Sequence, residues 1–304
     1  MMLRYHRLAL HPVVFKAMTG LTVAQFDALY ADFAPRFAAA ERERLGRRPA
    51  RRRAIGGGHP FGLARRDQLL LTVAWLRRYP INAVLGFLFG VEETTALRTV
   101  RRVLPVLEAA GLDSMRQPDP GKWKRPGLDA LLADTPELAL IVDTFEQRVQ
   151  RPRDRAEADG HYSGKKKQHT LKVQVAVRES GRVADVAESV RGPTADITLL
   201  NESGLAGRLP EGVGLLGDLA YVGVAELHPA GLGATPRRKP RGKPRPDADV
   251  AYNTAFARRR VVVEHTIGRM RCYRALADAD RHHRRQHTAR TRAVAGLVNR
   301  CLAA

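Results

Sequence analysis

The chain has 304 residues, of which 44% are hydrophobic, enough for one large or two modest domains with a proper core. Lysine and arginine number 52 against 31 acidic residues, and the resulting charge of +21 favours nucleic acid as partner over a membrane surface. Two cysteines exclude a disulfide scaffold, and no apolar run reaches the roughly 18 residues of a membrane helix, so we expect a cytoplasmic protein.

Residues 1–112 have the hydrophobic spacing of a helical domain. Thr22 is a predicted N-cap, and the apolar residues after it recur at helical intervals up to Pro35, which we expect to end or kink the helix. Residues 44–53 carry six arginines and precede a glycine-rich stretch, so they are predicted to form an exposed basic linker.

Three further helices are expected at residues 63–79, 81–89 and 92–110, because Pro80 and Gly90 interrupt the helical pattern. A short helix, a turn with glycine and a longer helix are typical of a helix-turn-helix DNA-binding motif, although an ordinary helical hairpin fits the same pattern. The arginines of the longer helix that would approach DNA are Arg98, Arg101 and Arg102.

A linker at residues 113–135, marked by proline, glycine and aspartate, is predicted to lead into a second domain at residues 136–304. That domain opens with a run of apolar residues from Leu138 that reaches Asp143 directly. A run that is apolar on both faces predicts a buried central strand. We therefore expect Asp143 at the end of this strand, at the rim of a sheet, where open sheets place their sites.

The same pattern returns at Asp218. Residues 153–160 are predicted to form a charged loop, and residues 170–177 and 183–190 two antiparallel strands before a helix that begins near Pro193. The apolar run 212–217 then ends in Asp218. Two apolar runs that each deliver an aspartate are much less expected by chance than one.

A long helix is predicted over residues 249–273, with an apolar face that includes Val263 and Ile267. Glu264 lies at the border of that face, and Arg260 and Arg271 lie on the same edge. Taken alone, this arrangement is explained by an ordinary salt bridge on a solvated helix.

Asp143, Asp218 and Glu264 together suit phosphodiester chemistry. That chemistry requires a deprotonated nucleophile and neutralisation of the charge on the leaving oxygen, and two Mg²⁺ (or Mn²⁺) ions held by carboxylates supply both. The order strand, strand, strand, helix, strand, helix matches an α/β ribonuclease-H-like core, a mixed sheet flanked by helices. The three acids are therefore the predicted catalytic and metal-binding residues.

In these residues the chain resembles the DDE transposases of the IS5 insertion-sequence group, relatives of the Harbinger-type nucleases. The resemblance covers nearly the whole chain and includes the helix-turn-helix region, Ile141-Val142-Asp143, residues 162–172 and Gly217-Asp218-Leu219-Ala220-Tyr221. Its last part runs from Arg260 through Glu264 to Arg271, and matches the family pattern of Arg, three residues, Glu, six residues, Lys, with arginine in place of the lysine. The family's tyrosine three positions before the arginine is Ala257 here, which puts a secondary DNA contact in doubt but not the acids.

The resemblance implies a transposase that binds the terminal inverted repeats of its own element, cleaves DNA at the element ends and joins the 3′-hydroxyls to target DNA. It implies double-stranded DNA and at least one further copy of the chain as partners, no membrane, and a location at the bacterial nucleoid. The residues expected to hold DNA phosphates are Arg148, Arg151, Lys165, Lys166, Lys167, Arg237, Arg238, Lys239, Arg241, Lys243, Arg260 and Arg271.

Two other functions stay open at this stage. One is a catalytically silent DNA-binding regulator derived from a transposase, against which the three intact acids argue. The other is a structure-selective DNA nuclease that has the same ribonuclease-H-like core but does not join strands. A cleavage and strand-transfer assay separates all three functions.

Overall fold

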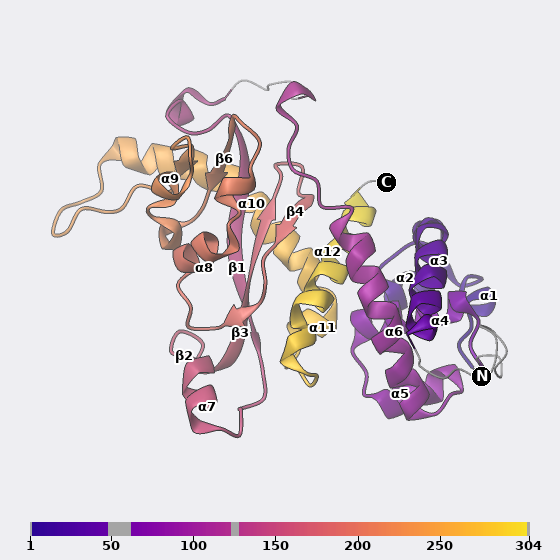
Figure 1. The fold of residues 1–304 in the computed structure, drawn as a ribbon. Helices are drawn as coiled ribbons and strands as arrows, with labels where there is room; N and C mark the ends of the chain where they lie inside the picture. Colours follow the sequence, from indigo (N-terminus) through magenta and orange to yellow (C-terminus); the bar gives the residue numbers. More distant parts are fainter. Residues whose placement is uncertain (1, 48–61, 123–127, 303–304) are drawn as a thin grey trace. The chain divides into compact units, whose positions relative to one another are not determined.

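The computed structural model describes residues 2–47, 62–122 and 128–302, which form two compact units (Figure 1). The helical unit comprises residues 1–113, 272–277 and 289–304, and the sheet unit comprises residues 114–271 and 278–288. Most of the C-terminal helix belongs to the helical unit, whereas the boundaries expected from the sequence assign it to the second domain. Those boundaries stay predictions. The central part of the predicted basic linker lies outside the described residues.

The helical unit is built around α4, whose residues from Asp67 to Leu76 are all buried. Its helices are α1 (Tyr5–Leu8), α2 (Pro12–Thr19), α3 (Val23–Gly46), α4 (Arg65–Arg78), α5 (Asn82–Phe89), α6 (Glu93–Leu112), α11 (Arg274–Ala277) and most of α12 (His287–Leu302). The sequence predicted the short α5 and the longer α6, with a turn at Gly90 between them. In the described part of the chain, no helix is both long and apolar enough to cross a membrane.

Helix α3 begins as predicted but does not end where predicted. Thr22 caps it, since its side chain accepts a hydrogen bond from the Gln25 amide while the Gln25 side chain accepts one from the Thr22 amide. The helix continues through Pro35, so of the two outcomes expected there, an end or a kink, the end was wrong. Phe33 and Phe37 on either side of the proline are buried and stacked 5.1 Å apart, and this packing outweighs the lost hydrogen bond.

The sheet unit has a ribonuclease-H-like topology. Among the described residues, seven strands form one sheet in which β1 pairs with β3 on one side and β6 on the other. The strands are β1 (Leu138–Arg148), β2 (Tyr162–Ser163), β3 (Gln168–Val177), β4 (Val183–Val186), β5 (Val190–Arg191), β6 (Val213–Leu216) and β7 (Gly233–Ala234). Strand β3 is antiparallel to β1, β2, β4 and β5, whereas β6 is parallel to β1 and β7. The mixed sheet predicted from the sequence is confirmed.

Helices cover the two faces of this sheet. Alternate β1 residues Leu140 and Val142 share a core with Leu200 at α8 (Asp196–Ser203), while α10 (Asp247–Arg271) contacts β1 and β3 from the other face. Two short helices complete the unit, α7 (Arg155–His161) and α9 (Val224–Leu227), with 3₁₀ turns at Pro120–Lys122, Ala130–Leu132, Ala206–Arg208, Leu219–Tyr221 and Arg284–Gln286. The charged loop predicted at residues 153–160 was wrong, because Asp154 caps α7 by accepting a hydrogen bond from the Glu157 amide.

Two glycines fix the contact between α6 and α12 within the helical unit. A Cβ atom added to Gly296 would lie 2.4 Å from the Gly111 Cα atom, and one added to Gly111 would lie 2.5 Å from the Arg292 carbonyl oxygen. The two helix backbones therefore touch directly.

We expect Gly296→Ala to lower the free energy of unfolding by about 1–3 kcal/mol, because the methyl group has no room. Gly46→Ala, in α3 of the same unit and with no atom within 4 Å of its added Cβ, is the matched control and should cost nothing. Urea unfolding followed by far-ultraviolet circular dichroism measures both. Equal stability of the two variants would show that α6 and α12 do not pack through these glycines.

Candidate functional site

Asp143 and Asp218 are brought level by the pairing of two parallel strands. β1 and β6 pair from Leu138 with Val213 to Ile141 with Leu216, and each aspartate lies two residues beyond the last pair. Neighbouring strands lie about 4.8 Å apart. The two carboxylates therefore lie at one edge of the parallel part of the sheet, on adjacent chain segments.

Asp143 does not end its strand, so that expectation was wrong. β1 continues to Arg148, and Asp143 pairs with Val175 in the antiparallel ladder with β3. The apolar run from Leu138 stops at Asp143, but Phe145 and Gln147 beyond it are buried and the β3 ladder holds the backbone extended. The edge exists because the parallel partner β6 stops at Leu216, and not because β1 stops.

Asp218 is held by the turn that follows β6. Its Oδ1 atom accepts a hydrogen bond from the Ala220 amide at 2.8 Å and caps the turn Leu219–Tyr221. The buried Tyr221 ring lies against the backbone of Gly217, where an added Cβ would come within 2.5 Å of the Tyr221 Cβ atom. Glycine before the aspartate is therefore required by this close approach.

Arg260 on α10 connects the remaining acid to β1. Its Nη2 atom lies 3.5 Å from Asp143 Oδ2, and its Nη1 atom lies 3.9 Å from Glu264 Oε1. The arginine side chain is 11% exposed and the Glu264 side chain 59%. The i, i+4 salt bridge expected on this helix is therefore present, but the arginine is largely buried and is shared with Asp143.

The neighbouring Arg259 fixes α10 in place, a role that the sequence analysis missed. Its guanidinium donates to the carbonyl oxygens of Pro136 and Glu137, both at 2.6 Å, and to Glu179 Oε1 at 2.5 Å. These bonds tie the helix to the segment that enters β1. Arg259 positions the helix, while Arg260, one residue on, reaches the acid.

Burial dominates the electrostatics of Asp143. Loss of water raises the pKa of Asp143 to about 6, against the lowering effects of the Thr144 amide and the Arg260 charge. The charges of Asp218 and Asp196 raise it further. An acid at this position is stabilised by any cation that reaches it.

Asp196, in the first turn of α8, is a further acid that sequence reasoning missed. It pairs with the buried Lys172 at 2.6 Å, and Lys172 also donates to the Thr194 carbonyl. Burial and the charges of Asp196, Asp143 and Asp218 raise the pKa of Tyr221. The available signal was Lys172 itself, a charged residue in the largely apolar run 171–177 of β3.

The donor chemistry of Asp143, Asp218 and Glu264 fits a hard divalent cation, which prefers carboxylate oxygens. Within the described ranges, however, no group of three or more histidine, cysteine, aspartate or glutamate side chains is arranged to hold a metal ion. Arg260 contacts Asp143 and Glu264. Metal binding at these acids stays a prediction.

Most of the predicted DNA-contact residues are exposed, and three are engaged in the fold. Arg102 lies 3.8 Å from Glu41 and is largely buried, Arg237 contacts Asp134 and Asp249, and Arg260 contacts the acids. The exposed residues without such ion pairs among the described contacts are Arg98, Arg101, Arg148, Arg151, Lys165, Lys166, Lys167, Arg238, Lys239, Arg241, Lys243 and Arg271.

Comparison with known proteins gives two family matches and one relative. Residues 142–299 match the family described as DDE superfamily endonuclease, and residues 62–112 match the helix-turn-helix of DDE superfamily endonuclease. The second match spans α4, α5 and α6, which confirms the helix-turn-helix interpretation. The chain is 26% identical over 290 residues to the probable transposase for insertion sequence element IS702 of Microchaete diplosiphon, covering 94% of this chain and 93% of that protein. No solved structure gives a significant match.

We expect Asp143→Asn to stabilise the protein at pH 8, measured without added divalent ions. A raised carboxyl pKa contributes stability below the unfolded value of about 4, and that stability is lost as the pH rises through about 6. Asparagine resembles the protonated acid, so the variant should match the wild type at pH 4 and exceed it by about 3 kcal/mol at pH 8. Urea unfolding at pH 4, 6 and 8 measures this, and a difference that does not change with pH would contradict it.

Proposed function

Because the chain belongs to the DDE superfamily endonucleases, we propose that it is the transposase of an insertion sequence, which cleaves DNA at the ends of its element and joins the 3′-hydroxyls to target DNA. The observation that carries the proposal is the register of β1 and β6, which sets Asp143 and Asp218 level beside the helix of Glu264. The helix-turn-helix match in the same chain supports recognition of the terminal inverted repeats.

Asp143, Asp218 and Glu264 would hold the metal ions. This superfamily usually uses divalent metal ions, and we propose two Mg²⁺ or Mn²⁺ ions here. When bound, they supply an activated nucleophile and neutralise the leaving oxygen. The rigid backbone of β1 holds Asp143 in place, and the turn at Asp218 holds the second carboxylate. Arg260 would orient the third carboxylate, Glu264.

The remaining basic residues would position the DNA. Exposed lysines and arginines on the loop 237–245 and on residues 148–167 suit phosphate oxygens, which carry no sequence information. Sequence reading would fall to α6 of the helix-turn-helix. Since an element has two ends, the working assembly would contain at least two copies of the chain.

Asp218→Asn should lower the rate of Mg²⁺-dependent cleavage of inverted-repeat DNA by on the order of 10³-fold. Loss of a residue that only supports a metal ligand typically lowers activity by about 10–100-fold, and loss of a metal ligand itself should lower it further. Asp247→Asn, an exposed acid in the first turn of α10, is the matched control and should leave cleavage unchanged. Both variants should bind the repeats like the wild type.

Gel assays of cleavage and strand transfer decide between the functions. Cleavage by Asp218→Asn at the wild-type rate would show that the site is wrong. A wild-type protein that cuts the repeats but does not join them would be a structure-selective nuclease, and one that binds without cutting would be a DNA-binding regulator.

Two classes of arginine on α6 should respond differently to substitution. Arg98→Gln and Arg101→Gln remove exposed charges, so each should weaken binding and reduce the slope of log Kd against log salt by about 0.9, with no change in stability. Arg102→Gln removes a largely buried partner of Glu41 and should lower the unfolding free energy by about 1–3 kcal/mol.

Fluorescence anisotropy over a series of salt concentrations and thermal unfolding of all three variants measure these effects. A stable Arg102→Gln protein with a reduced salt slope would place Arg102 among the DNA contacts after all.

A further inference from the structure

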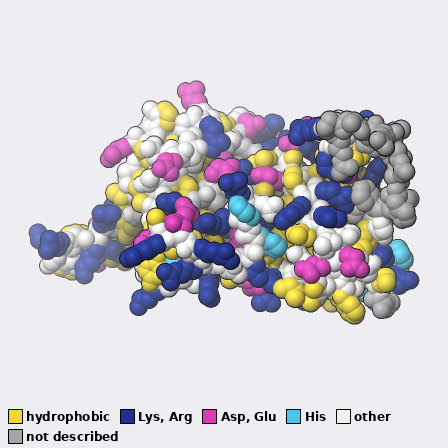
Figure 2. Space-filling model, turned by 60° about the horizontal axis from the view of Figure 1, so that its bottom comes forward, with side chains coloured by type: hydrophobic (Ala, Val, Ile, Leu, Met, Phe, Trp, Pro, Cys, Tyr) yellow, Lys and Arg dark blue, Asp and Glu magenta, His cyan; other side chains and the backbone are white. Residues whose placement is uncertain are grey.

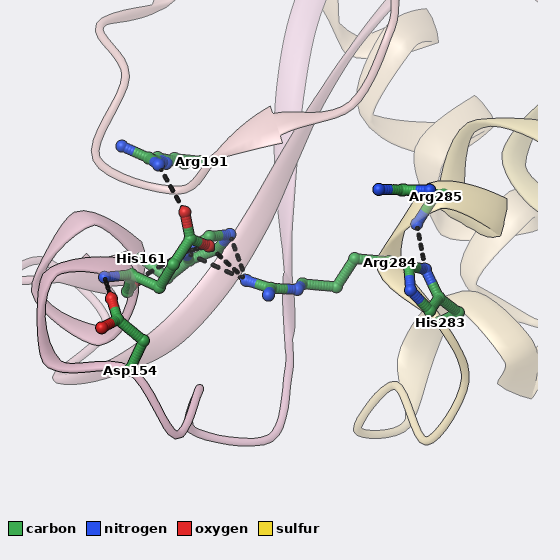
Figure 3. Close-up of polar contacts among 7 residues, drawn as sticks. Asp154, His161, Arg191, His283, Arg284 and Arg285 are labelled. Carbon is green, nitrogen blue, oxygen red and sulfur yellow. Dashed lines mark hydrogen bonds and ion pairs between the residues drawn. The ribbon is translucent and has the colours of Figure 1, made fainter.

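Outside the acidic site, one carboxylate of the sheet unit is shared by two arginines from distant segments. Glu157 on α7 accepts a hydrogen bond from Arg191 Nη2 at 2.8 Å and one from Arg284 Nη1 at 3.1 Å. Figure 3 shows these arginines reaching toward α7 from β5 and from the turn Arg284–Gln286. Glu157, Arg191 and Arg284 are called the Glu157 arginine cluster below.

The buried His161 side chain and the N-cap of α7 hold the cluster in place. His161, at the end of α7, is 4% exposed, and its Nε2 atom lies 3.0 Å from Arg284 Nη1. Its Nδ1 atom lies 2.7 Å from the Glu157 carbonyl oxygen. Asp154 caps the first turn of the same helix. Arg284 is therefore docked on a formed helix and not on a loop.

The segment that carries Arg284 is anchored to the end of β1. The Gln147 side chain donates to the Asp278 carbonyl at 2.7 Å and bonds His287 Nε2 at 2.8 Å. The Asp280 amide donates to the Arg148 carbonyl at 2.8 Å. These bonds fix both ends of residues 278–287 against the strand that carries Asp143.

Stability alone does not account for the cluster. Arg191 is 54% exposed and Arg284 38%, and exposed ion pairs contribute only about 0–1 kcal/mol. Two cations share one anion, so the cluster keeps a net positive charge. Among the described contacts, the bonds to Glu157 and His161 use one terminal nitrogen of each arginine, which leaves donors for another acceptor. Such a fork suits phosphate.

The cluster lies on the same face of the sheet as Asp143. Gln147 is four residues beyond Asp143 on β1, and it is in register with Leu171 of β3 and, through it, with Arg191 of β5. An even number of residues keeps the face. Four residues along a strand and two strands across place Arg191 about 16 Å from Asp143. In duplex DNA, that is about four to five base pairs.

The surroundings of the cluster are basic. Between residues 148 and 167 there are seven lysines and arginines against three acids, and Lys165, Lys166 and Lys167 are exposed. Arg285 is exposed next to Arg284. Figure 2 shows lysine and arginine side chains gathered on the face that includes this end of the sheet unit.

We infer that the Glu157 arginine cluster, with Lys165, Lys166 and Lys167, binds the sugar-phosphate backbone of duplex DNA four to five base pairs from the scissile phosphate. This inference rests on the proposed function and adds a defined contact site to it. Glu157 holds the two arginines ready, so little side-chain entropy is lost when the phosphates bind. The contact is independent of base sequence.

The first test compares the full chain with the double variant Arg191→Gln/Arg284→Gln. Two lost phosphate contacts should reduce the salt slope by about 1.8 and weaken binding roughly ten-fold, equally for repeat and random duplexes. Arg191→Lys/Arg284→Lys should retain most of the affinity. Arg208→Gln, an exposed arginine paired with Asp185 beside α8, is the matched control and should bind like the wild type. Thermal unfolding confirms that all variants fold.

The second test places single methylphosphonates, which are uncharged, along a duplex that contains the cleavage site. A methylphosphonate four to five positions from the scissile phosphate should weaken DNA binding by the wild type but not by the Arg191→Gln/Arg284→Gln variant. If the wild type binds and cleaves while the double variant shows the same Kd, salt slope and methylphosphonate profile, the inference fails and the proposed function stands. If the wild type neither binds nor cleaves its repeats, both fail.

Discussion

The parallel pairing of β1 with β6 is the constraint on which the acidic site depends. Its last pair, Ile141 with Leu216, sets the level of both aspartates. A slip by one residue would turn Asp143 to the other face of the sheet and away from α10. The register is held by apolar packing, since Leu140, Val142 and Leu215 share one core with α8. The positions of the carboxylates are thus determined by residues that take no part in their chemistry.

Helix α10 completes the site through two consecutive arginines with different roles. Arg259 bonds the backbone that leads into β1, and Arg260 reaches Asp143 and Glu264. Consecutive helical residues point about 100° apart, so one turn of helix can be anchored and still present a charge to the acids. Because Arg259 binds the segment that leads directly into the strand of Asp143, helix and strand keep their spacing, which is what a preorganised site requires.

The sequence predicted what local pattern determines and missed what depends on distant partners. Apolar runs predicted both segments that carry an aspartate. The Thr22 cap predicted the start of α3, and the turn at Gly90 predicted the helix-turn-helix. The extension of β1 past Asp143 depends on β3, and the continuation of α3 past Pro35 depends on buried phenylalanines. The Lys172–Asp196 pair joins β3 to α8, two segments that no periodicity relates. Helix α7 could have been predicted, because Asp154 and Glu157 have the spacing of an N-terminal helix cap, although they lie in a run of charged residues.

The distribution of charge explains how a strongly basic chain can keep an acidic site. Asp143 is desolvated enough for its pKa to rise to about 6, so cations are drawn to it, and Arg260 is the one that contacts it in the described structure. Exposed basic residues lie on residues 148–167 and 237–245, and most of them have no acidic partner among the described contacts. In the proposed function, these peripheral residues would hold a polyanion, while the acids would keep their affinity for small cations.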